Sequence, residues 1–270
     1  MFLHKGRGNI LWGIIDRGKI LSIKDIKIGD VFQMNAGGSL TITSIEGSKK
    51  IGVVHNDDFR HEDTVELARV MRGSVKNPFT KSVLGLGYLG FGKYKTQVNK
   101  VVTISYAVWV AMLTRCYGAI NNPKNIRYKD CTVCESWLDF QVFSEWYCGN
   151  ESYGLGYELD KDLLVKGNKI YSSDTCTLIP HTINTVINVK SYKASGLPTG
   201  VCKHHSGAYE SAVKFKGGVK YLGYFKDKDE AFLIYKKEKE IILKTLALEW
   251  KGKIEDKAFL ALLNWEVDKF

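Results

Sequence analysis

The most constraining feature of the sequence is a change in the spacing of its apolar residues near the carboxyl end. Through residues 200–225, apolar and polar residues alternate, and small turn-forming residues interrupt the alternation twice. This pattern predicts three short antiparallel strands joined by tight turns. In residues 228–250, apolar residues instead recur at helical spacing. We therefore expect a three-stranded antiparallel sheet followed by a long helix. The predicted turns fall at Ser206-Gly207 and Gly217-Gly218.

The remaining segments differ from one another in composition. Residues 1–75 hold short runs of Val, Ile and Thr between Gly, Ser and Asn, which is typical of a small β domain. Residues 76–98 are rich in glycine and aromatic residues and are expected to be a linker. Residues 99–190 form the expected central domain, residues 195–254 the sheet-and-helix domain, and residues 255–270 a final helix. The chain is thus predicted to be a multi-domain α+β protein.

Two helices are expected in the central domain. Residues 106–118 are apolar almost all round, which predicts a buried helix. Residues 135–147 place four aromatic side chains on one broad helical face. A stripe of this kind is typical of a hydrophobic core, so we interpret it as core.

The charge of the chain favours a polyanionic partner. Its 39 basic and 29 acidic residues give a net charge of +10, and each phosphate that a lysine or arginine neutralises releases condensed counterions. Residues 190–254 hold 14 lysines against 7 acids, a net charge of +7, whereas residues 151–189 hold 5 acids against 3 lysines, a net charge of −2. Double-stranded DNA is the expected partner, and a basic surface that only aids solubility is the alternative.

The amino-terminal residues predict a cytoplasmic protein. Their apolar run is interrupted by glycine, asparagine and aspartate, unlike that of an export signal, and no segment approaches the roughly 18 apolar residues that a membrane span requires. No association with a membrane is therefore expected. In a reducing compartment, the six cysteines are expected to be thiols or metal ligands rather than disulfides.

Residues 159–188 are the segment most suggestive of chemistry. Asp160 and Asp162 follow a strand-like stretch, residues 168–172 resemble a second strand, and a helix-like segment with Asn184 comes next. Strand, loop, strand and helix, with an acid on the first strand and an amide on the helix, is the layout of a ββα-metal site. Such a site holds one hard divalent cation between the acid and the amide.

Residues 109–188 resemble the HNH endonuclease family, in particular its phage and homing members. The resemblance places Asp160 and Asn184 at the family's metal-binding positions, for Mg²⁺ or Mn²⁺, and Asn168 at the position that orders the loop. It implies hydrolysis of DNA phosphodiester bonds. The candidate catalytic residues are Asp160, Lys161, Asp162, Asn168, His181 and Asn184.

Lys161 departs from the family pattern, which has a catalytic histidine at this position. An amine with an ordinary pKa near 10.4 is a poor base unless burial or a nearby cation lowers that pKa. Three alternatives could supply the base. The pKa of Lys161 can be lowered in this way, or His181 can reach the site from the helix. Asp162 can instead act as the base or as a second cation ligand. The remaining alternative is a decayed nuclease that binds DNA as a regulator or counter-defence factor without cutting it.

Residues 200–235 resemble the Apetala or ethylene-responsive-factor type of DNA-binding domain. The resemblance rests on Gly200-Val201, on Tyr209 to Ala212 and on Tyr221 to Phe225, followed by Asp229 to Ala231 and Tyr235. It implies that the sheet enters the major groove of DNA. The sheet has no arginine, unlike the plant domains, which implies looser or different reading of bases. The strand residues expected to be exposed and to contact DNA are Lys203, His205, Tyr209, Ser211, Lys214 and Lys216.

Two further hypotheses concern the rest of the chain. Cys131 and Cys134 have the spacing of half a zinc site, which Cys148 and Cys176 can complete. Buried thiols that pack as small apolar groups are the favoured alternative. Residues 1–75 can also contact a protein partner, in which case the basic face would be incidental.

Overall fold

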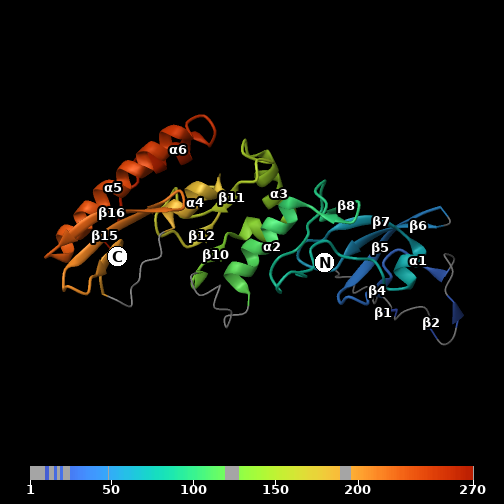
Figure 1. Ribbon diagram of the computed structural model, residues 1–270. Helices are drawn as coiled ribbons and strands as arrows, with labels where there is room; N and C mark the ends of the chain where they lie inside the picture. The colour runs from blue at the N-terminus through green and yellow to red at the C-terminus, as the bar shows by residue number, and fades with distance from the viewer. Residues whose placement is uncertain are drawn as a thin grey trace, which may run out of the picture. The chain divides into compact units, whose positions relative to one another are not determined.

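The computed structural model describes residues 25–47, 49–118, 128–188 and 196–269, together with the backbone of three short strands nearer the amino terminus. The fold is α+β (Figure 1). The chain forms two compact units, residues 1–92 and 93–270, and each is described by itself. No helix in the described residues is both long enough and apolar enough to cross a lipid bilayer.

The first unit is built on a five-stranded sheet in the order β1-β4-β5-β6-β7. Strand β1 pairs parallel with β4, and the other neighbours are antiparallel. Alternate side chains such as Leu40, Ile42 and Val53 pack into its core, as the Val- and Ile-rich runs lead one to expect. The elements are β1 (Ile10–Leu11), β2 (Ile15–Asp16), β3 (Lys19–Ile20), β4 (Val31–Gln33), β5 (Ser39–Glu46), β6 (Lys50–His55), β7 (Glu62–Glu66) and α1 (Leu67–Met71).

The second unit begins with a hairpin and alternating short elements. Strand β8 pairs with β9, β10 pairs parallel with β12, and β11 pairs antiparallel with β13. The elements are β8 (Gln97–Val98), β9 (Val101–Val102), α2 (Ile104–Tyr117), β10 (Thr132–Val133), the 3₁₀ helix η3 (Glu135–Leu138), α3 (Phe140–Gly149), β11 (Glu158–Asp160), β12 (Ile170–Tyr171), β13 (Thr177–Ile179) and α4 (His181–Ile187).

The structure corrects both predicted helices of the central domain. Helix α2 is buried along one side only, through Trp109, Met112 and Leu113, while Ile104 is exposed. The predicted helix over 135–147 is broken, because the side chain of Asp139 accepts a hydrogen bond from the backbone N–H of Gln141 and starts α3 afresh. The aromatic side chains of this region do form core, with Trp137, Phe140 and Phe143 fully buried.

The strand pairing around Asp160 also differs from the prediction. The expected second strand of the metal-site layout, residues 168–172, contains β12, but β12 pairs with β10. The antiparallel partner of β11 is β13, which directly precedes α4. A strand-loop-strand-helix order is therefore present, with Thr177–Ile179 in the place of the expected second strand.

The carboxyl-terminal elements agree with the apolar spacing. Strands β14 (Val201–Lys203), β15 (Tyr209–Phe215) and β16 (Gly218–Phe225) form an antiparallel sheet, and α5 (Lys228–Glu249) packs on one side of it. Figure 1 shows α5 running along β15 and β16, with α6 (Asp256–Leu263) after it. The second hairpin turn lies at Lys216-Gly217, one residue before the predicted position, with both φ angles positive at 47° and 80°.

One hydrophobic core joins this sheet to β13 and α4. Ile179, Ile183 and Val186 lie in the same buried cluster as Val213 and Leu243. Polar contacts reinforce the junction, since the hydroxyl of Thr177 donates to a carboxylate oxygen of Glu255 at 2.5 Å and the hydroxyl of Tyr157 donates to the carbonyl oxygen of Lys253 at 3.1 Å. The core is therefore continuous across the central and sheet-and-helix segments expected from the sequence.

Helix α5 carries a buried lysine on its core-facing side. Lys239 lies one helical turn from Tyr235 and from Leu243 and is 3% exposed. Burial disfavours the charged amine and lowers the pKa of Lys239 from 10.5 to about 8. The unfolded chain therefore binds more protons than the folded chain between these two pKa values. The charge on Lys239 costs stability at neutral pH, and this cost fades as the pH rises through that window.

We predict that Lys239→Met raises the free energy of unfolding at pH 7 by about 2–3 kcal/mol. The gain over the wild type should shrink as the pH approaches 10.5. Urea denaturation of both proteins across this pH range measures the effect, and exposed Lys237→Met is the matched control. A loss of stability in Lys239→Met at pH 7 would contradict the prediction.

Candidate active site and nucleic-acid interface

A pocket of about 300 Å³ lies among β11, α4 and the end of α2 in the second unit. It gathers charged and amide side chains that are far apart in the sequence. Its lining residues are Arg115, Tyr128, Glu158, Leu159, Asp160, Lys161, Asp162, Tyr171, His181, Asn184, Thr185 and Asn188. Five of the six predicted catalytic residues therefore line one pocket, and the sixth, Asn168, contacts one of them.

Glu158 joins β11 to α4 across this pocket. Its Oε1 lies 2.9 Å from Nδ1 of His181, and its Oε2 accepts a hydrogen bond from Nδ2 of Asn184 at 2.5 Å. Partial burial opposes ionisation, but the hydrogen bonds from Asn184 and His181 outweigh burial and lower the pKa of Glu158. The carboxylate therefore fixes the orientation of both α4 side chains.

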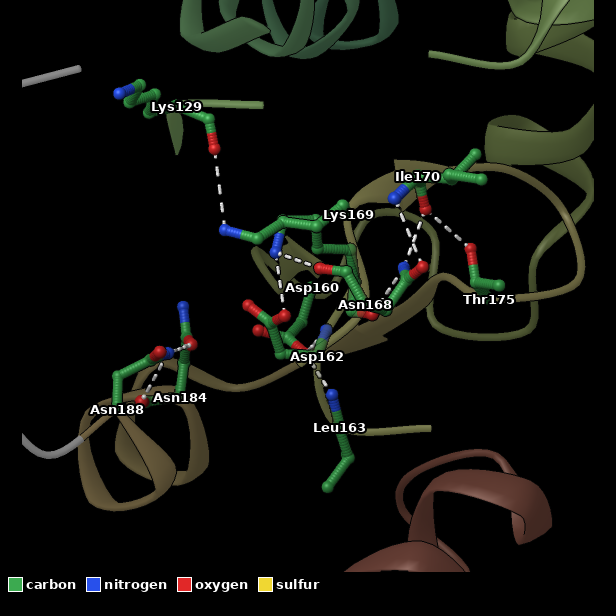
Figure 2. Close-up of polar contacts among 11 residues, drawn as sticks. Lys129, Asp160, Asp162, Leu163, Asn168, Lys169, Ile170, Thr175, Asn184 and Asn188 are labelled. Carbon is green, nitrogen blue, oxygen red and sulfur yellow. Dashed lines mark hydrogen bonds and ion pairs between the residues drawn. The ribbon is translucent and has the colours of Figure 1, made fainter. Parts of the chain in front are cut away.

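Asp160 is a buried carboxylate that also shapes the following turn. Its Oδ1 accepts hydrogen bonds from the backbone N–H of Asp162 at 2.9 Å and of Leu163 at 2.7 Å (Figure 2). Burial raises the pKa of Asp160 despite these two hydrogen bonds. A bound cation would offset that cost by favouring the charged form. Among the described contacts, Oδ2 is the oxygen of Asp160 left for such a cation.

Lys161 and Asn168 fasten the loop that follows Asp160. The buried amine of Lys161 lies 2.6 Å from Oδ1 of Asp162 and donates to the carbonyl oxygen of Asn168 at 2.7 Å. The amide of Asn168 donates to the carbonyl oxygens of Lys161 and Ile170 (Figure 2). Asn168 thus holds the two sides of the loop together. Lys161 and Asp162 form an ion pair with each other, so neither side chain is favoured as the general base.

Helix α4 carries the remaining candidates. His181 begins the helix, its side chain is 78% exposed, and its Nε2 lies 3.3 Å from the hydroxyl of Thr185. Asn184 lies one turn later, and its Oδ1 accepts from the amide of Asn188 (Figure 2). The helix therefore presents an accessible imidazole and an amide oxygen on the side that lines the pocket.

The oxygen atoms of this pocket fit a hard divalent cation. Oδ2 of Asp160 offers a carboxylate oxygen and Asn184 offers an amide oxygen, whereas both carboxylate oxygens of Glu158 are held by His181 and Asn184. Mg²⁺ commonly takes only one or two protein carboxylates and completes its shell with water and phosphate oxygens. No group of three or more His, Cys, Asp or Glu side chains in the described residues is arranged for a metal ion. A cation here would therefore rely on substrate and water for most of its ligands.

Glu158 and Arg115 line the pocket but were not predicted as site residues from the sequence. Glu158 lies two positions before Asp160 on β11, so the period of a strand places both on one face and could have identified it. Arg115 lies in the last turn of α2, where its guanidinium group is 5.6 Å from the ring centre of Tyr128. A single arginine in an otherwise apolar helix is the only signal for it. Arg115 adds a fixed positive charge to a pocket lined by acids.

The structure corrects the face assigned to three predicted DNA contacts on the sheet, namely Lys203, Tyr209 and Ser211. Ser211 is fully buried on the side that faces α5, together with Val213, and Tyr209 and Phe215 are packed against the same core. Lys203 pairs with Tyr209 in register and shares its side, at the exposed edge of the sheet.

Two other predicted contacts lie at the turns of the sheet. The amine of Lys216 reaches Glu249 on α5 at 3.3 Å. His205 lies in the turn after β14, with its ring centre 3.9 Å from that of His204.

The open side of the sheet carries a different set of residues. Lys214 is exposed there, opposite Val219, and Tyr221 and Tyr224 are 68% and 60% exposed. A bulge in β16 leaves Leu222 without a partner, so Tyr221 and Tyr224 pair with Ala212 and Glu210 and point to the same side. Lys214 is thus the predicted DNA contact that shares a face with these two tyrosines.

The four candidate zinc ligands occupy different environments. Cys131 and Cys176 are buried, whereas Cys134 and Cys148 are half-buried. Burial raises the pKa of Cys176 to about 12, which keeps the thiol protonated near neutrality. Zinc binds thiolates, so ligation at Cys176 would have to overcome this burial.

We predict that Lys161→Met lowers the free energy of unfolding by about 1–3 kcal/mol, because it leaves Asp162 and the carbonyl oxygen of Asn168 without their partner. Chemical denaturation measures the loss. Lys169→Met on the same loop is the control, since the Lys169 amine makes only a 3.4 Å contact with the carbonyl oxygen of Lys129. Equal stability of the two variants would show that the buried ion pair contributes nothing.

Comparisons with known proteins identify no relative of this chain. No protein-family model matches it, and neither the curated proteins nor the solved structures contain a match. The resemblances to HNH nucleases and to the Apetala-type domain stay predictions.

Proposed function

We propose that this chain binds double-stranded DNA and hydrolyses its phosphodiester bonds with the help of a divalent cation. One observation carries the proposal. An acid on β11, a histidine and an asparagine on α4, and an arginine on α2 line a single pocket. These are the groups that phosphodiester hydrolysis requires, namely oxygen ligands for a cation, a general base and a positive charge for the phosphate.

Each residue has a role that its contacts support. Asp160 and Asn184 are the cation ligands, and the cation, when bound, stabilises the charge that develops on the phosphate and on the leaving oxygen. His181 is the general base. Glu158 lies 2.9 Å from its Nδ1 and holds the proton on that nitrogen, so Nε2, which lies 3.3 Å from the hydroxyl of Thr185, is the nitrogen that accepts a proton from water. Arg115 binds a phosphate oxygen.

DNA binding is assigned to the open side of the carboxyl-terminal sheet. The segment from 190 to 254 carries a net charge of +7, whereas the segment from 151 to 189, which holds most of the pocket, carries −2. Residues 201–225, which hold the sheet, contain four lysines and one acid, a net charge of +3, so the sheet supplies part of the attraction for phosphate that the acidic pocket lacks. Lys214 contacts phosphate, and the exposed rings of Tyr221 and Tyr224 contact the groove.

A second candidate function is DNA binding without cleavage. The specific observation in its favour is Lys161, which stands where the HNH family has its catalytic histidine and whose amine is held by Asp162 and Asn168. In this alternative the pocket is a structural remnant, and the sheet alone acts. A cleavage assay separates the two functions.

We predict that the wild type nicks supercoiled plasmid DNA in Mg²⁺ or Mn²⁺, and that Asp160→Asn and Asn184→Ala each lower the rate at least about 100-fold. His181→Ala should lower it by a similar factor through loss of the base. Gel electrophoresis of the plasmid measures the rate, and filter binding shows whether DNA affinity is retained.

The control for this assay is Asp174→Asn, which removes an exposed acid outside the pocket. Its rate should equal that of the wild type. Intact plasmid after incubation of the wild type with either cation, across several sequences, would leave only the non-cleaving alternative.

We predict that Lys214→Gln weakens DNA binding and lowers the slope of log affinity against log salt by about 0.9, because one phosphate contact is lost. Lys216→Gln is the matched control, since its amine already pairs with Glu249. Titration of a labelled duplex at several salt concentrations gives both slopes. A larger effect of Lys216→Gln than of Lys214→Gln would contradict the assignment of the interface to the open side of the sheet.

A further inference from the structure

The β8–β9 hairpin is a short ribbon with a tight tip. Val98 pairs with Val101 and Gln97 pairs with Val102, so only Asn99 and Lys100 form the turn. Both turn residues have positive φ angles, 50° and 64°. A two-residue turn of this kind matches the natural twist of paired strands. The tip is therefore a defined structure and not a loose loop.

The base of the ribbon is tied to α2 and α3. The hydroxyl of Thr103, at the start of α2, donates to the carbonyl oxygen of Lys95 at 2.8 Å. The backbone N–H of Tyr94 donates to Oε1 of Gln141, and Nε2 of Gln141 donates back to the carbonyl oxygen of Tyr94, at 2.9 and 3.0 Å. These contacts hold the ribbon in position on the same unit that contains the pocket.

The ribbon exposes branched apolar side chains. Val98 and Val101 are 51% and 69% exposed on one face, and Val102 is 48% exposed on the other. Ile104, just beyond the ribbon, is 59% exposed. Several exposed aliphatic side chains in one small element are typical of a contact surface rather than of a solvated hairpin.

The charge of the ribbon indicates what covers it. Residues 93–104 contain three lysines and no acidic residue. Lys93 pairs with Glu145 at 3.0 Å, whereas Lys95 and Lys100 are exposed and have no ion-pair partner in the described part of the chain. Two free lysines favour a polyanion, and they oppose docking against a second copy of the same ribbon.

We propose that this ribbon enters the major groove of duplex DNA. A two-stranded ribbon fits that groove, which is about 12 Å wide. Val98 and Val101 contact the methyl groups of thymine, and Lys95 and Lys100 contact the flanking phosphates. The inference rests on the DNA-binding part of the proposed function and is independent of cleavage.

Equilibrium binding to two labelled duplexes tests it, one of mixed sequence and the other identical but with uracil in place of thymine. We expect the wild type to bind the uracil duplex about threefold to tenfold more weakly, because its methyl contacts are lost. The double variant Val98→Ser with Val101→Ser, which removes every methyl group of the two side chains, should bind both duplexes equally, at the weaker level. Exposed Val142→Ser, on α3, is the control and should behave as the wild type.

A second variant tests the phosphate contacts. Lys95→Gln with Lys100→Asn should lower the salt slope by about 1.8, and asparagine tolerates the positive φ at the tip. Unchanged binding by both double variants, with unchanged thermal stability, would overturn the ribbon contact while leaving the sheet interface in place. A change in sedimentation instead of in DNA affinity would assign the ribbon to self-association and also overturn it. A wild type that binds no duplex would remove the proposed function itself.

Discussion

The carboxylate of Glu158 is the contact on which the geometry of the pocket depends. It belongs to a short strand, and it bonds to the first and fourth residues of a helix of only seven residues. A helix this short has little stability of its own. Its position is set by the burial of Ile183 and Val186 in the core and by the hydrogen bonds of its pocket side to Glu158. The side chains of His181 and Asn184 are thus oriented by Glu158 together with their contacts to Thr185 and Asn188.

Acidic and basic side chains are concentrated in different parts of the second unit. The pocket brings together Glu158, Asp160 and Asp162 with few cations, whereas the adjoining sheet and helix are rich in lysine. Acidic oxygens suit a divalent cation but repel phosphate. Lysine-rich surfaces attract phosphate over the Debye length, about 10 Å at moderate salt. In the proposed function, the residues that attract phosphate would therefore differ from those that hold the cation. The pocket itself contains two basic side chains, Arg115 and Lys161.

The parts of the fold that follow local rules could be predicted from the sequence. Strands β14 to β16 and helix α5 could be predicted because alternation, turns and helical spacing are short-range signals. The pairing of β12 with β10 could not, since it joins segments that lie far apart in the chain and are each only two residues long. The break at Asp139 could have been anticipated, because aspartate is a strong helix-capping residue.

The candidate site shows the same limits. A sequence motif identified Asp160, His181 and Asn184. Arg115 could not be identified in this way, because only the packing of α2 brings it to the pocket. On the sheet, polarity was a misleading guide, because Ser211 is polar yet lies on the side that the strand period assigns to the core. The bulge at Leu222 that brings Tyr221 and Tyr224 to one face leaves no clear mark in the sequence.

The core shared by α4, the three-stranded sheet and α5 holds the pocket and the sheet in a fixed relative position. Ile183 and Val186 pack in the same cluster as Val213 and Leu243, so the pocket and the sheet cannot swing independently. A DNA-binding domain and a nuclease domain joined by a flexible linker would cleave at a range of distances from the bound sequence. Under the proposed function, the shared core would therefore fix the distance between the bases bound by the sheet and the phosphodiester bond at the pocket.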